Sequence, residues 1–224
     1  MPTDPRPPRG VFVTGTDTGV GKTVVASLLT LAWPGAYYWK PVQCGADPST
    51  DRAAVAQATG LAPERILPEA YNLALPQSPH VAAAAEGITV DRARLALPQA
   101  DGPIVVEGAG GILVPLNDHD TMADLMTWLD LPVVLVARTQ LGTLNHTLLS
   151  LEALRRRSLD VRLLVLNGPP VATTTATLRQ WGKVPMLAEL PPLGSLAPEP
   201  MREASRRLAT QISLARLEAA DGRR

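Results

Sequence analysis

Short, almost continuously apolar runs alternate with longer segments of helical periodicity along this chain. Strands covered on both faces have such continuous runs, and amphipathic helices have apolar residues three or four positions apart. The runs lie at 11–14, 36–40, 103–107, 132–137, 161–167 and 184–190. The helical segments lie at 23–32, 51–58, 121–129, 145–157, 172–181 and 199–217. This alternation predicts an α/β fold with a doubly wound, mainly parallel sheet and helices on both faces.

The length and composition of the chain predict a single folded domain. Its 224 residues, 46% of them hydrophobic, are enough for the core of one α/β domain, which we expect to span 11–217. Residues 1–10 are polar and rich in proline, so we expect a flexible leader there. We expect 218–224 to form a flexible tail.

The charge balance and the cysteine content exclude several classes of protein. The 21 basic and 21 acidic residues give a formal net charge of zero, so no general attraction to nucleic acid or an anionic membrane is expected. The single cysteine excludes an internal disulfide, and no apolar run approaches the roughly 18 residues of a membrane span. The leader lacks the apolar core of a signal peptide, and we expect a cytoplasmic protein that binds small molecules or another protein chain.

A glycine-rich stretch, GTDTGVGKT, joins the first expected strand to the first expected helix. Nucleotide-binding loops have the spacing G-x-x-x-x-G-K-[ST], but here Gly15 comes one residue early and Thr16 stands in the usual place of the first glycine. The order of strand, loop, Gly-Lys-Thr and apolar helix still predicts a P-loop NTPase fold. A glycine-rich turn without a ligand is the alternative.

The residue types within this stretch suit the parts of a nucleotide. Gly19 and Gly21 let backbone N–H groups turn toward phosphate oxygens, and the following helix presents its positive end to the same charge. Lys22 supplies a mobile ammonium, and the hydroxyl of Thr23 suits a magnesium ion.

Polar residues end three of the expected strands, at Lys40, Glu107 and Asn167. Ligands of open α/β sheets bind at the carboxyl ends of the strands, so these residues are expected to share one site. Glu107, followed by GAGG, is typical of a magnesium ligand, although a carboxylate that caps a neighbouring turn is the alternative. Asp51 is either a second carboxylate near the metal or the cap of the helix that begins there.

Five motifs occur in a fixed order, and together they span most of the chain. They are VTGTDTGVGKT (13–23), KPVQCG (40–45), SPHVAAAAEG (78–87), VEGAGGILVPL (106–116) and LGTLNHTLLSLEAL (141–154). This set closely resembles the dethiobiotin synthetases, the ATP-dependent enzymes of biotin synthesis. That family carries the same lengthened loop, with its first glycine one place early.

The resemblance implies a reaction that joins CO2 to 7,8-diaminopelargonate in a cyclic urea while ATP becomes ADP and phosphate. One amine takes up CO2 as a carbamate, the carbamate oxygen attacks the γ-phosphorus to give a carbamic-phosphoric anhydride, and the second amine displaces phosphate. The resemblance also implies Mg2+ and a homodimer. In that dimer the turn LGTLNHT reaches the carboxylate of the substrate across the interface.

The resemblance further implies a role for each matching residue. The residues expected to act in catalysis are Lys22 and Lys40, which neutralise charge around the γ-phosphate and the carbamate. The residues expected to hold Mg2+ are Thr23, Asp51 and Glu107. The residues expected to bind ATP are Gly19, Val20, Gly21, Lys22, Thr23, Val24, Asp51, Glu107, Gly108, Ala109, Gly110, Asn167, Gly168, Pro191, Pro192 and Leu193. The residues expected to bind the diamine are Cys44, Gly142, Thr143 and Asn145.

Cys44 departs from the family pattern, in which KPVxxG usually has serine or threonine at this place. A thiol is a poorer hydrogen-bond partner than a hydroxyl, so Cys44 either contacts the diamine weakly or fills a gap as a small apolar residue. The histidines, His80, His119 and His146, are not spaced as metal ligands, and we expect structural or surface roles for them.

Two other functions fit part of the sequence. A chromosome-partitioning type P-loop ATPase, which is a dimerising switch, would share the fold and the ending GVGKT, but it needs a signature lysine where this chain has Asp17. An ionised carboxylate cannot donate a hydrogen bond to the phosphate of a partner, which counts against the switch. A small-molecule kinase would release a stable phosphorylated product, and the motifs do not favour it.

Overall fold

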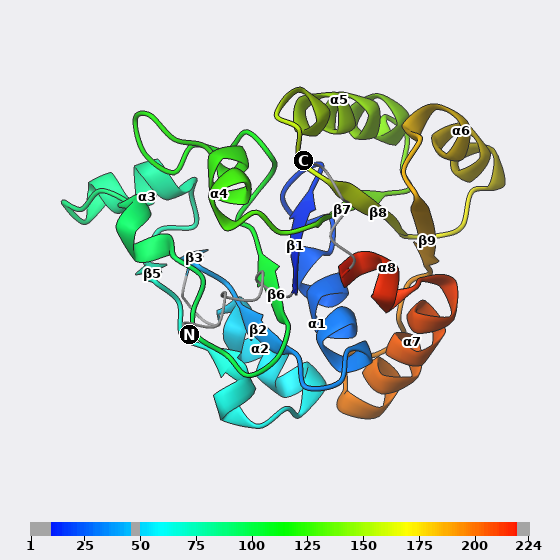
Figure 1. Cartoon of the computed structure of the whole chain (residues 1–224), viewed down its shortest axis with the longest axis horizontal. Coiled ribbons are helices and arrows are strands. Elements are labelled where there is room, and N and C mark those ends of the chain that lie inside the picture. Colours follow the sequence, from blue (N-terminus) through cyan, green and yellow to red (C-terminus); the bar gives the residue numbers. More distant parts are fainter. Residues whose placement is uncertain (1–9, 46–49, 219–224) are drawn as a thin grey trace, which may run out of the picture.

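A seven-stranded parallel sheet forms the centre of the molecule (Figure 1). The computed structural model describes residues 10–45 and 50–218. The strands lie in the order β4-β2-β6-β1-β7-β8-β9, and every pairing between neighbours is parallel. Their bounds are β1 Gly10–Gly15, β2 Tyr37–Trp39, β4 Ile66–Leu67, β6 Ile104–Glu107, β7 Val133–Arg138, β8 Val161–Asn167 and β9 Met186–Leu190.

The sheet confirms the predicted α/β architecture, and each of the six predicted strands is present. The sequence does not predict the edge strand β4, because two residues are too few to show a period. Two more strands, β3 (Val42–Cys44) and β5 (Tyr71–Leu73), pair in parallel as a separate small sheet. The sequence does not predict them either, because three residues between loops carry the same weak signal.

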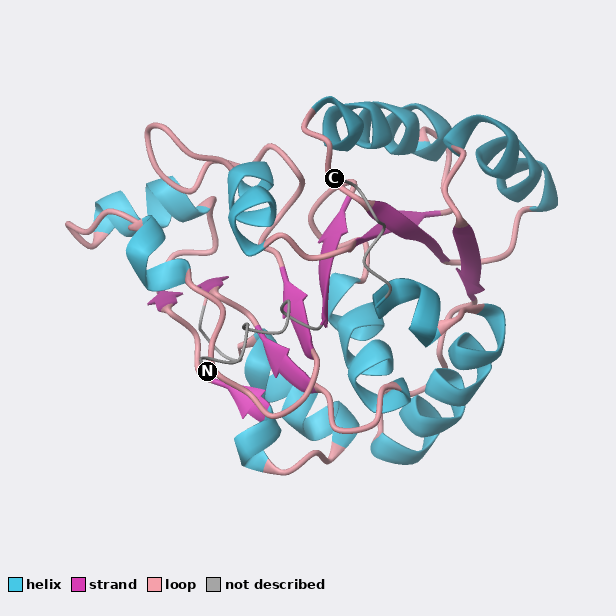
Figure 2. Cartoon of the chain, viewed as in Figure 1, coloured by secondary structure: helices cyan, strands magenta, loops and turns pink. Residues whose placement is uncertain are grey.

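Helices cover both faces of the sheet (Figure 2). One face packs against α1 (Lys22–Ala32), α2 (Asp51–Thr59), α7 (Pro198–Gln211) and α8 (Leu214–Glu218). The other packs against α4 (Met122–Leu129), α5 (Thr143–Arg156) and α6 (Ala172–Gly182). The helix α3 (Pro79–Ala85) lies beside the small sheet, and two short 3₁₀ helices span Pro63–Arg65 and Arg92–Leu95.

Side chains of β1 alternate between the two hydrophobic cores. Val11 and Val13 belong to the core beneath α1 and α7, whereas Phe12 belongs to the core beneath α4 and α5. Such alternation follows from the two-residue period of a strand, and it leaves β1 buried on both sides. The loop that follows β1 therefore begins from a rigid position at the centre of the sheet.

The prediction of one helix over 199–217 is wrong, because this segment forms two helices. Ile212, after α7, has an extended backbone with φ −126° and ψ 162°. The buried guanidinium of Arg162 on β8 donates hydrogen bonds to the carbonyls of Arg216 (3.0 Å) and Leu217 (2.9 Å). The chain therefore bends after α7, and Arg162 binds the short helix α8 to the sheet.

The ends of the chain fall partly outside the described residues. The predicted leader, apart from Gly10 at the start of β1, and the predicted tail beyond Glu218 are not described. Within 10–45 and 50–218, no helix has both the length and the hydropathy that crossing a bilayer requires.

Candidate nucleotide-binding site

The glycine-rich loop lies between β1 and α1, at the carboxyl edge of the sheet. Gly19 (φ 72°) and Gly21 (φ 97°) have the left-handed backbone that glycine adopts without strain. A Cβ atom on Gly21 would lie 2.0 Å from Nδ2 of Asn167, so a larger residue does not fit there. Among the described residues, no side chain caps the start of α1, and its first N–H groups can therefore bind an anion.

Two neighbouring strands hold this loop from outside. Nδ2 of Asn167, at the end of β8, donates a hydrogen bond of 2.8 Å to the carbonyl of Val20. Arg138, at the end of β7, donates from Nη2 to Oδ2 of Asp17 (3.0 Å) and to the carbonyl of Thr18 (3.3 Å). Both anchors come from strand ends that pair in register, Arg138 beside Asn167.

Lys22 is buried and reaches back over the loop. Its Nζ donates a hydrogen bond of 3.0 Å to the carbonyl of Asp17. Burial lowers the pKa of Lys22 to about 8, although the carboxylate of Glu107 acts in the opposite direction. The ammonium is therefore inside the loop, where phosphate oxygens would meet it.

Glu107 is the centre of the charged part of the site. Its Oε1 accepts hydrogen bonds from the hydroxyl of Thr23 (2.8 Å) and from Nζ of Lys40 (3.0 Å). Its Oε2 accepts a hydrogen bond of 2.8 Å from the hydroxyl of Tyr38. Only 1% of Glu107 is exposed, so these partners take the place of water around its two oxygen atoms. Both oxygen atoms of Glu107 therefore have side-chain partners, which differs from the alternative of a carboxylate that caps a neighbouring turn.

Lys40 joins the two carboxylates expected to be metal ligands. Its Nζ lies 2.5 Å from Oδ2 of Asp51 and 3.0 Å from Oε1 of Glu107. Burial alone would lower the pKa of Lys40, but the two carboxylates outweigh it and hold that pKa above its ordinary value. Lys40 is therefore a buried ammonium at the point where the oxygen donors converge.

The helix α2 begins at Asp51, but its cap is Thr50. The hydroxyl of Thr50 accepts a hydrogen bond of 3.1 Å from the backbone N–H of Ala53. The backbone N–H of Asp51 donates to Oε1 of Gln43 (3.0 Å), while its carboxylate pairs with Lys40. The capping alternative for Asp51 is thus wrong, and its side chain belongs to the charged site.

These donors suit a hard divalent cation. The side chains of Thr23, Asp51 and Glu107 offer only oxygen atoms, which are the ligands that Mg2+ takes. The two carboxylates already neutralise the positive charge of Lys40, so their position suits a cation. Within 10–45 and 50–218 there is no cluster of three or more histidine, cysteine, aspartate or glutamate side chains that could hold a metal, and this site has two such residues and a threonine.

The turn after β6 passes close to the loop. The backbone N–H of Gly108 donates to the carbonyl of Val13 (2.9 Å), and a Cβ atom on Gly108 would lie 2.8 Å from Phe12. Ala109 is buried, and Gly110 has a left-handed backbone with φ 64°. The expected ATP-binding turn is therefore held against the end of β1.

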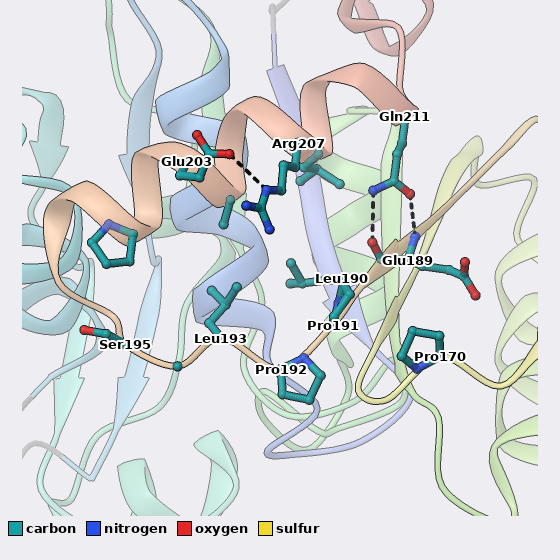
Figure 3. Close-up of a pocket in the computed structure, with 14 residues that line it drawn as sticks. Pro170, Glu189, Leu190, Pro191, Pro192, Leu193, Ser195, Glu203, Arg207 and Gln211 are labelled. Carbon is teal, nitrogen blue, oxygen red and sulfur yellow. Dashed lines mark hydrogen bonds and ion pairs between the residues drawn. The ribbon is translucent and has the colours of Figure 1, made fainter.

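The expected base-binding residues divide into two places. Asn167 touches the loop, and the N–H of Gly168 donates to the carbonyl of Leu190 (2.9 Å). Pro191, Pro192 and Leu193 instead line a cleft of about 530 Å³ between the end of β9 and α7 (Figure 3). The opposite wall of this cleft is formed by residues of α7, among them Glu203, Arg207 and Gln211.

The expected diamine-binding residues lie at the start of α5 and in β3. Gly142 (φ 94°) precedes α5, and among the described residues no side chain caps this helix. The hydroxyl of Thr143 donates a hydrogen bond of 2.5 Å to the carbonyl of Arg138, whereas Asn145 is exposed. Burial raises the pKa of the Cys44 thiol to about 11, so Cys44 is a neutral thiol near pH 7.

Sequence reasoning missed three residues of this site. Tyr38 stands two positions before Lys40, so the two-residue period of the strand placed both side chains on one face. Arg138 directly follows the apolar run 132–137, and it has the same signal, a charge at a strand end, that singled out Glu107. Gln43, which accepts the N–H of Asp51, has no comparable signal in the sequence.

The lengthened loop, the uncapped start of α1 and the cations at the neighbouring strand ends define the class of this protein. It is a P-loop nucleotide-binding protein with an all-parallel central sheet. The family described as an AAA domain matches residues 9–200.

Comparison with curated proteins identifies the family more narrowly. The ATP-dependent dethiobiotin synthetase BioD of Rhodopseudomonas palustris (strain HaA2) is 50% identical over 194 residues, which are 87% of this chain and 91% of that protein. The biotin biosynthesis bifunctional protein BioCD of Bordetella avium (strain 197N) is 50% identical over 210 residues, which are 93% of this chain and 45% of that longer protein. The chain belongs to the dethiobiotin synthetase family.

A solved structure of a ParA family ATPase from Chlorobium tepidum TLS is similar in fold. Its TM-score is 0.48 at 14% identity, and the match covers 90% of this chain and 99% of that one. A likeness at that level carries no argument about function. The sequence relatives, at about half identity, favour the synthetase over the chromosome-partitioning alternative.

Proposed function

We propose that this chain converts 7,8-diaminopelargonate, CO2 and ATP into dethiobiotin, ADP and phosphate. Family membership supports the reaction, and one observation in the structure supports the roles of particular residues. Beside the nucleotide loop, the buried ammonium of Lys40 lies between the carboxylates of Asp51 and Glu107. A cation held at that point can stabilise negative charge on a carbamate and on the transferred phosphoryl group.

The reaction proceeds in three balanced steps. One amine of the substrate attacks CO2 and loses a proton, which gives a carbamate. A carbamate oxygen attacks the γ-phosphorus and ADP leaves, so the product is a carbamic-phosphoric anhydride. The second amine then attacks the carbamoyl carbon and loses a proton to solvent, phosphate leaves with the electrons of the broken C–O bond, and the urea ring closes. Phosphorylation is needed because a free carbamate is a poor electrophile.

Lys22 and Lys40 are the proposed catalytic cations. Lys22 lies inside the loop and would contact the β- and γ-phosphates, whereas Lys40 lies next to Glu107 and would face the carbamate. Thr23, Asp51 and Glu107 would hold Mg2+, which neutralises charge on the phosphate oxygens when it is bound. Lys40 pairs with one oxygen of each carboxylate, Oδ2 of Asp51 and Oε1 of Glu107, so its ammonium would lie beside the ion.

The nucleotide and the diamine would bind to different sets of residues. The turn of Gly108 to Gly110 and the loop backbone would hold the phosphates, and Asn167, Gly168 and Pro191 to Leu193 would hold the base. The uncapped start of α5 at Gly142, Thr143 and Asn145 suits the substrate carboxylate, and Cys44, at the end of β3, would contact the diamine elsewhere. We also propose that the protein is cytoplasmic.

A homodimer is part of this proposal. Leu141 is fully exposed, and Leu149 on α5 and Leu113 are 57% and 52% exposed. Leu141 directly precedes Gly142 and Leu149 lies farther along α5, and these exposed apolar side chains support an interface at this helix, where the turn of the partner subunit would complete the carboxylate site.

The experiment that tests the function uses the purified protein with ATP, Mg2+, bicarbonate and the diamine. ADP and dethiobiotin are followed together, and we expect equal amounts of both. Hydrolysis of ATP at a rate indifferent to the diamine would contradict the synthetase. A stable phosphorylated product without ring closure would instead indicate the small-molecule kinase.

A further inference from the structure

Arg138 holds the front of the nucleotide loop from the neighbouring strand. Its Nη2 donates hydrogen bonds to Oδ2 of Asp17 (3.0 Å) and to the carbonyl of Thr18 (3.3 Å). The last pair between β7 and β1 is Val136 with Gly15, so Arg138 lies two residues farther on, beside the loop residue Asp17. Its own carbonyl accepts the hydroxyl hydrogen bond of Thr143, which fixes the backbone of Arg138 as well.

Asp17 connects this anchor to the proposed catalytic Lys22. The carboxylate of Asp17 accepts from Arg138 through Oδ2 and from the backbone N–H of Thr18 through Oδ1 (2.7 Å). The carbonyl of the same residue accepts from Nζ of Lys22 (3.0 Å). The side chain and the carbonyl of one residue are separated by few bonds, so fixing the carboxylate also fixes the acceptor that holds the ammonium.

We propose that Arg138 is a positioning residue that acts through Asp17 to set the place of the Lys22 ammonium at the phosphates. The inference rests on the proposed role of Lys22 in binding ATP. The lengthened front of the loop, where Asp17 lies, is the segment that Arg138 holds, while Asn167 holds the rear at Val20. The extra residue thus creates a segment that needs its own anchor, and Arg138 provides it.

Because this ion pair is exposed, its effect on nucleotide chemistry can be measured apart from its effect on folding stability. The side chains of Arg138 and Asp17 are 39% and 57% exposed, and ion pairs in such surroundings contribute little to folding stability. A displaced ammonium, by contrast, changes the free energy of every interaction with the transferred phosphoryl group. Removal of the guanidinium should therefore affect nucleotide chemistry and leave the thermal transition nearly unchanged.

The test compares Arg138→Met, Arg138→Lys, Asp17→Asn and the double variant Arg138→Met/Asp17→Asn. ATP affinity is measured by calorimetry without the diamine, and kcat and KM are measured for both substrates. We expect Arg138→Met to lower ATP affinity and kcat/KM for ATP on the order of tenfold, and to change KM for the diamine less than about twofold. Arg138→Lys should restore most of the loss, because an ammonium can still pair with Asp17.

The double variant decides whether Arg138 acts through Asp17. If it does, the double variant should be no worse than the more impaired of the two single variants. Independent, multiplicative losses would overturn the proposal, and so would ATP affinity within twofold of the unaltered protein in Arg138→Met. A matched control is Arg156→Met, which removes another exposed, ion-paired arginine far along α5.

Two outcomes separate this inference from the proposed function. If the unaltered protein forms no dethiobiotin yet binds ATP, the function fails while the affinity measurements still decide the role of Arg138. If Arg138→Met lowers the thermal transition and raises both KM values alike, Arg138 is a structural residue and the inference is wrong.

Discussion

The hydroxyl of Tyr38 donates a hydrogen bond of 2.8 Å to Oε2 of Glu107, and both side chains are buried. The bond occupies one carboxylate oxygen and leaves the other, Oε1, with Thr23 and Lys40. Burial and the charge of Glu107 raise the pKa of Tyr38 well above its ordinary value, so the phenol remains a donor at every pH at which the protein would work. Tyr38 thereby orients the carboxylate expected to hold the metal.

Replacement of Tyr38 by phenylalanine tests this orientation. Tyr38→Phe keeps the ring but removes a hydrogen bond to a buried charge, and we expect a loss of about 1.5–3 kcal/mol in the free energy of unfolding. The Mg2+ concentration for half-maximal activity should rise several-fold. Urea unfolding and a magnesium titration measure the two effects, and an unchanged magnesium requirement would show that Tyr38 does not orient Glu107.

In the proposed metal site, Lys40 would compete with Mg2+ for the carboxylate oxygens of Asp51 and Glu107. Lys40→Met should lower kcat at least about a hundredfold, because the fixed cation at the reacting centre is lost. Without nucleotide, the same variant should bind Mg2+ more tightly, since its two carboxylates no longer pair with an ammonium. Thermal unfolding with and without Mg2+ measures this second effect, and a shift equal to that of the unaltered protein would contradict the metal site.

The pKa of Lys22 predicts how ATP binding depends on pH. Burial sets it at about 8 in the free protein, so the ammonium that should meet the phosphates is increasingly lost above that pH. ATP binding favours the charged form, and its affinity should therefore fall as the pH rises above about 8, by up to tenfold per unit. ATP is fully ionised there, so dissociation constants from pH 7.5 to 9.5 report on the protein. Lys22→Met should bind weakly at every pH with a flatter profile.

Arg162 offers a test of the break between α7 and α8. Arg162→Met leaves the carbonyls of Arg216 and Leu217 without this buried donor, and it removes the ion pair of 2.6 Å between Arg162 and Asp160. We expect a loss of about 2–4 kcal/mol in the free energy of unfolding, with kcat and both KM values unchanged. A change in KM without a loss of stability would mean that α8 communicates with the active site.

The exposed leucines near α5 test the proposed dimer. Leu149→Glu places a charge in the expected interface, and we expect monomers in sedimentation analysis and a KM for the diamine raised tenfold or more. Leu196→Glu, at another exposed apolar residue, is the matched control and should change neither result. A Leu149→Glu protein that remains dimeric would place the interface elsewhere.

Local patterns explain how much of the fold and the site could be predicted. The continuous apolar runs and the residues GVGKT are properties of short segments, and they predicted the sheet, the loop, Lys22 and Thr23. The strand-end rule gave Lys40, Glu107 and Asn167. The short strands β3, β4 and β5 lie below the length at which a period can be recognised, and the break at Ile212 depends on a side chain from β8.

By itself, the sequence determined the family, the spacing of the lengthened loop and the chemical identity of the charged residues. The tertiary structure alone decided which of them meet. Thr23 and Glu107 are 84 positions apart, and Asp17 and Arg138 are 121 apart, yet each pair is in hydrogen-bond contact. The physical reason is the strand order β6-β1-β7, which places the carboxyl ends of three distant segments side by side around one loop. In the sequence, Asp17 stood out only because it is not the lysine of a switch ATPase. In the structure, the same residue contacts both Arg138 and Lys22.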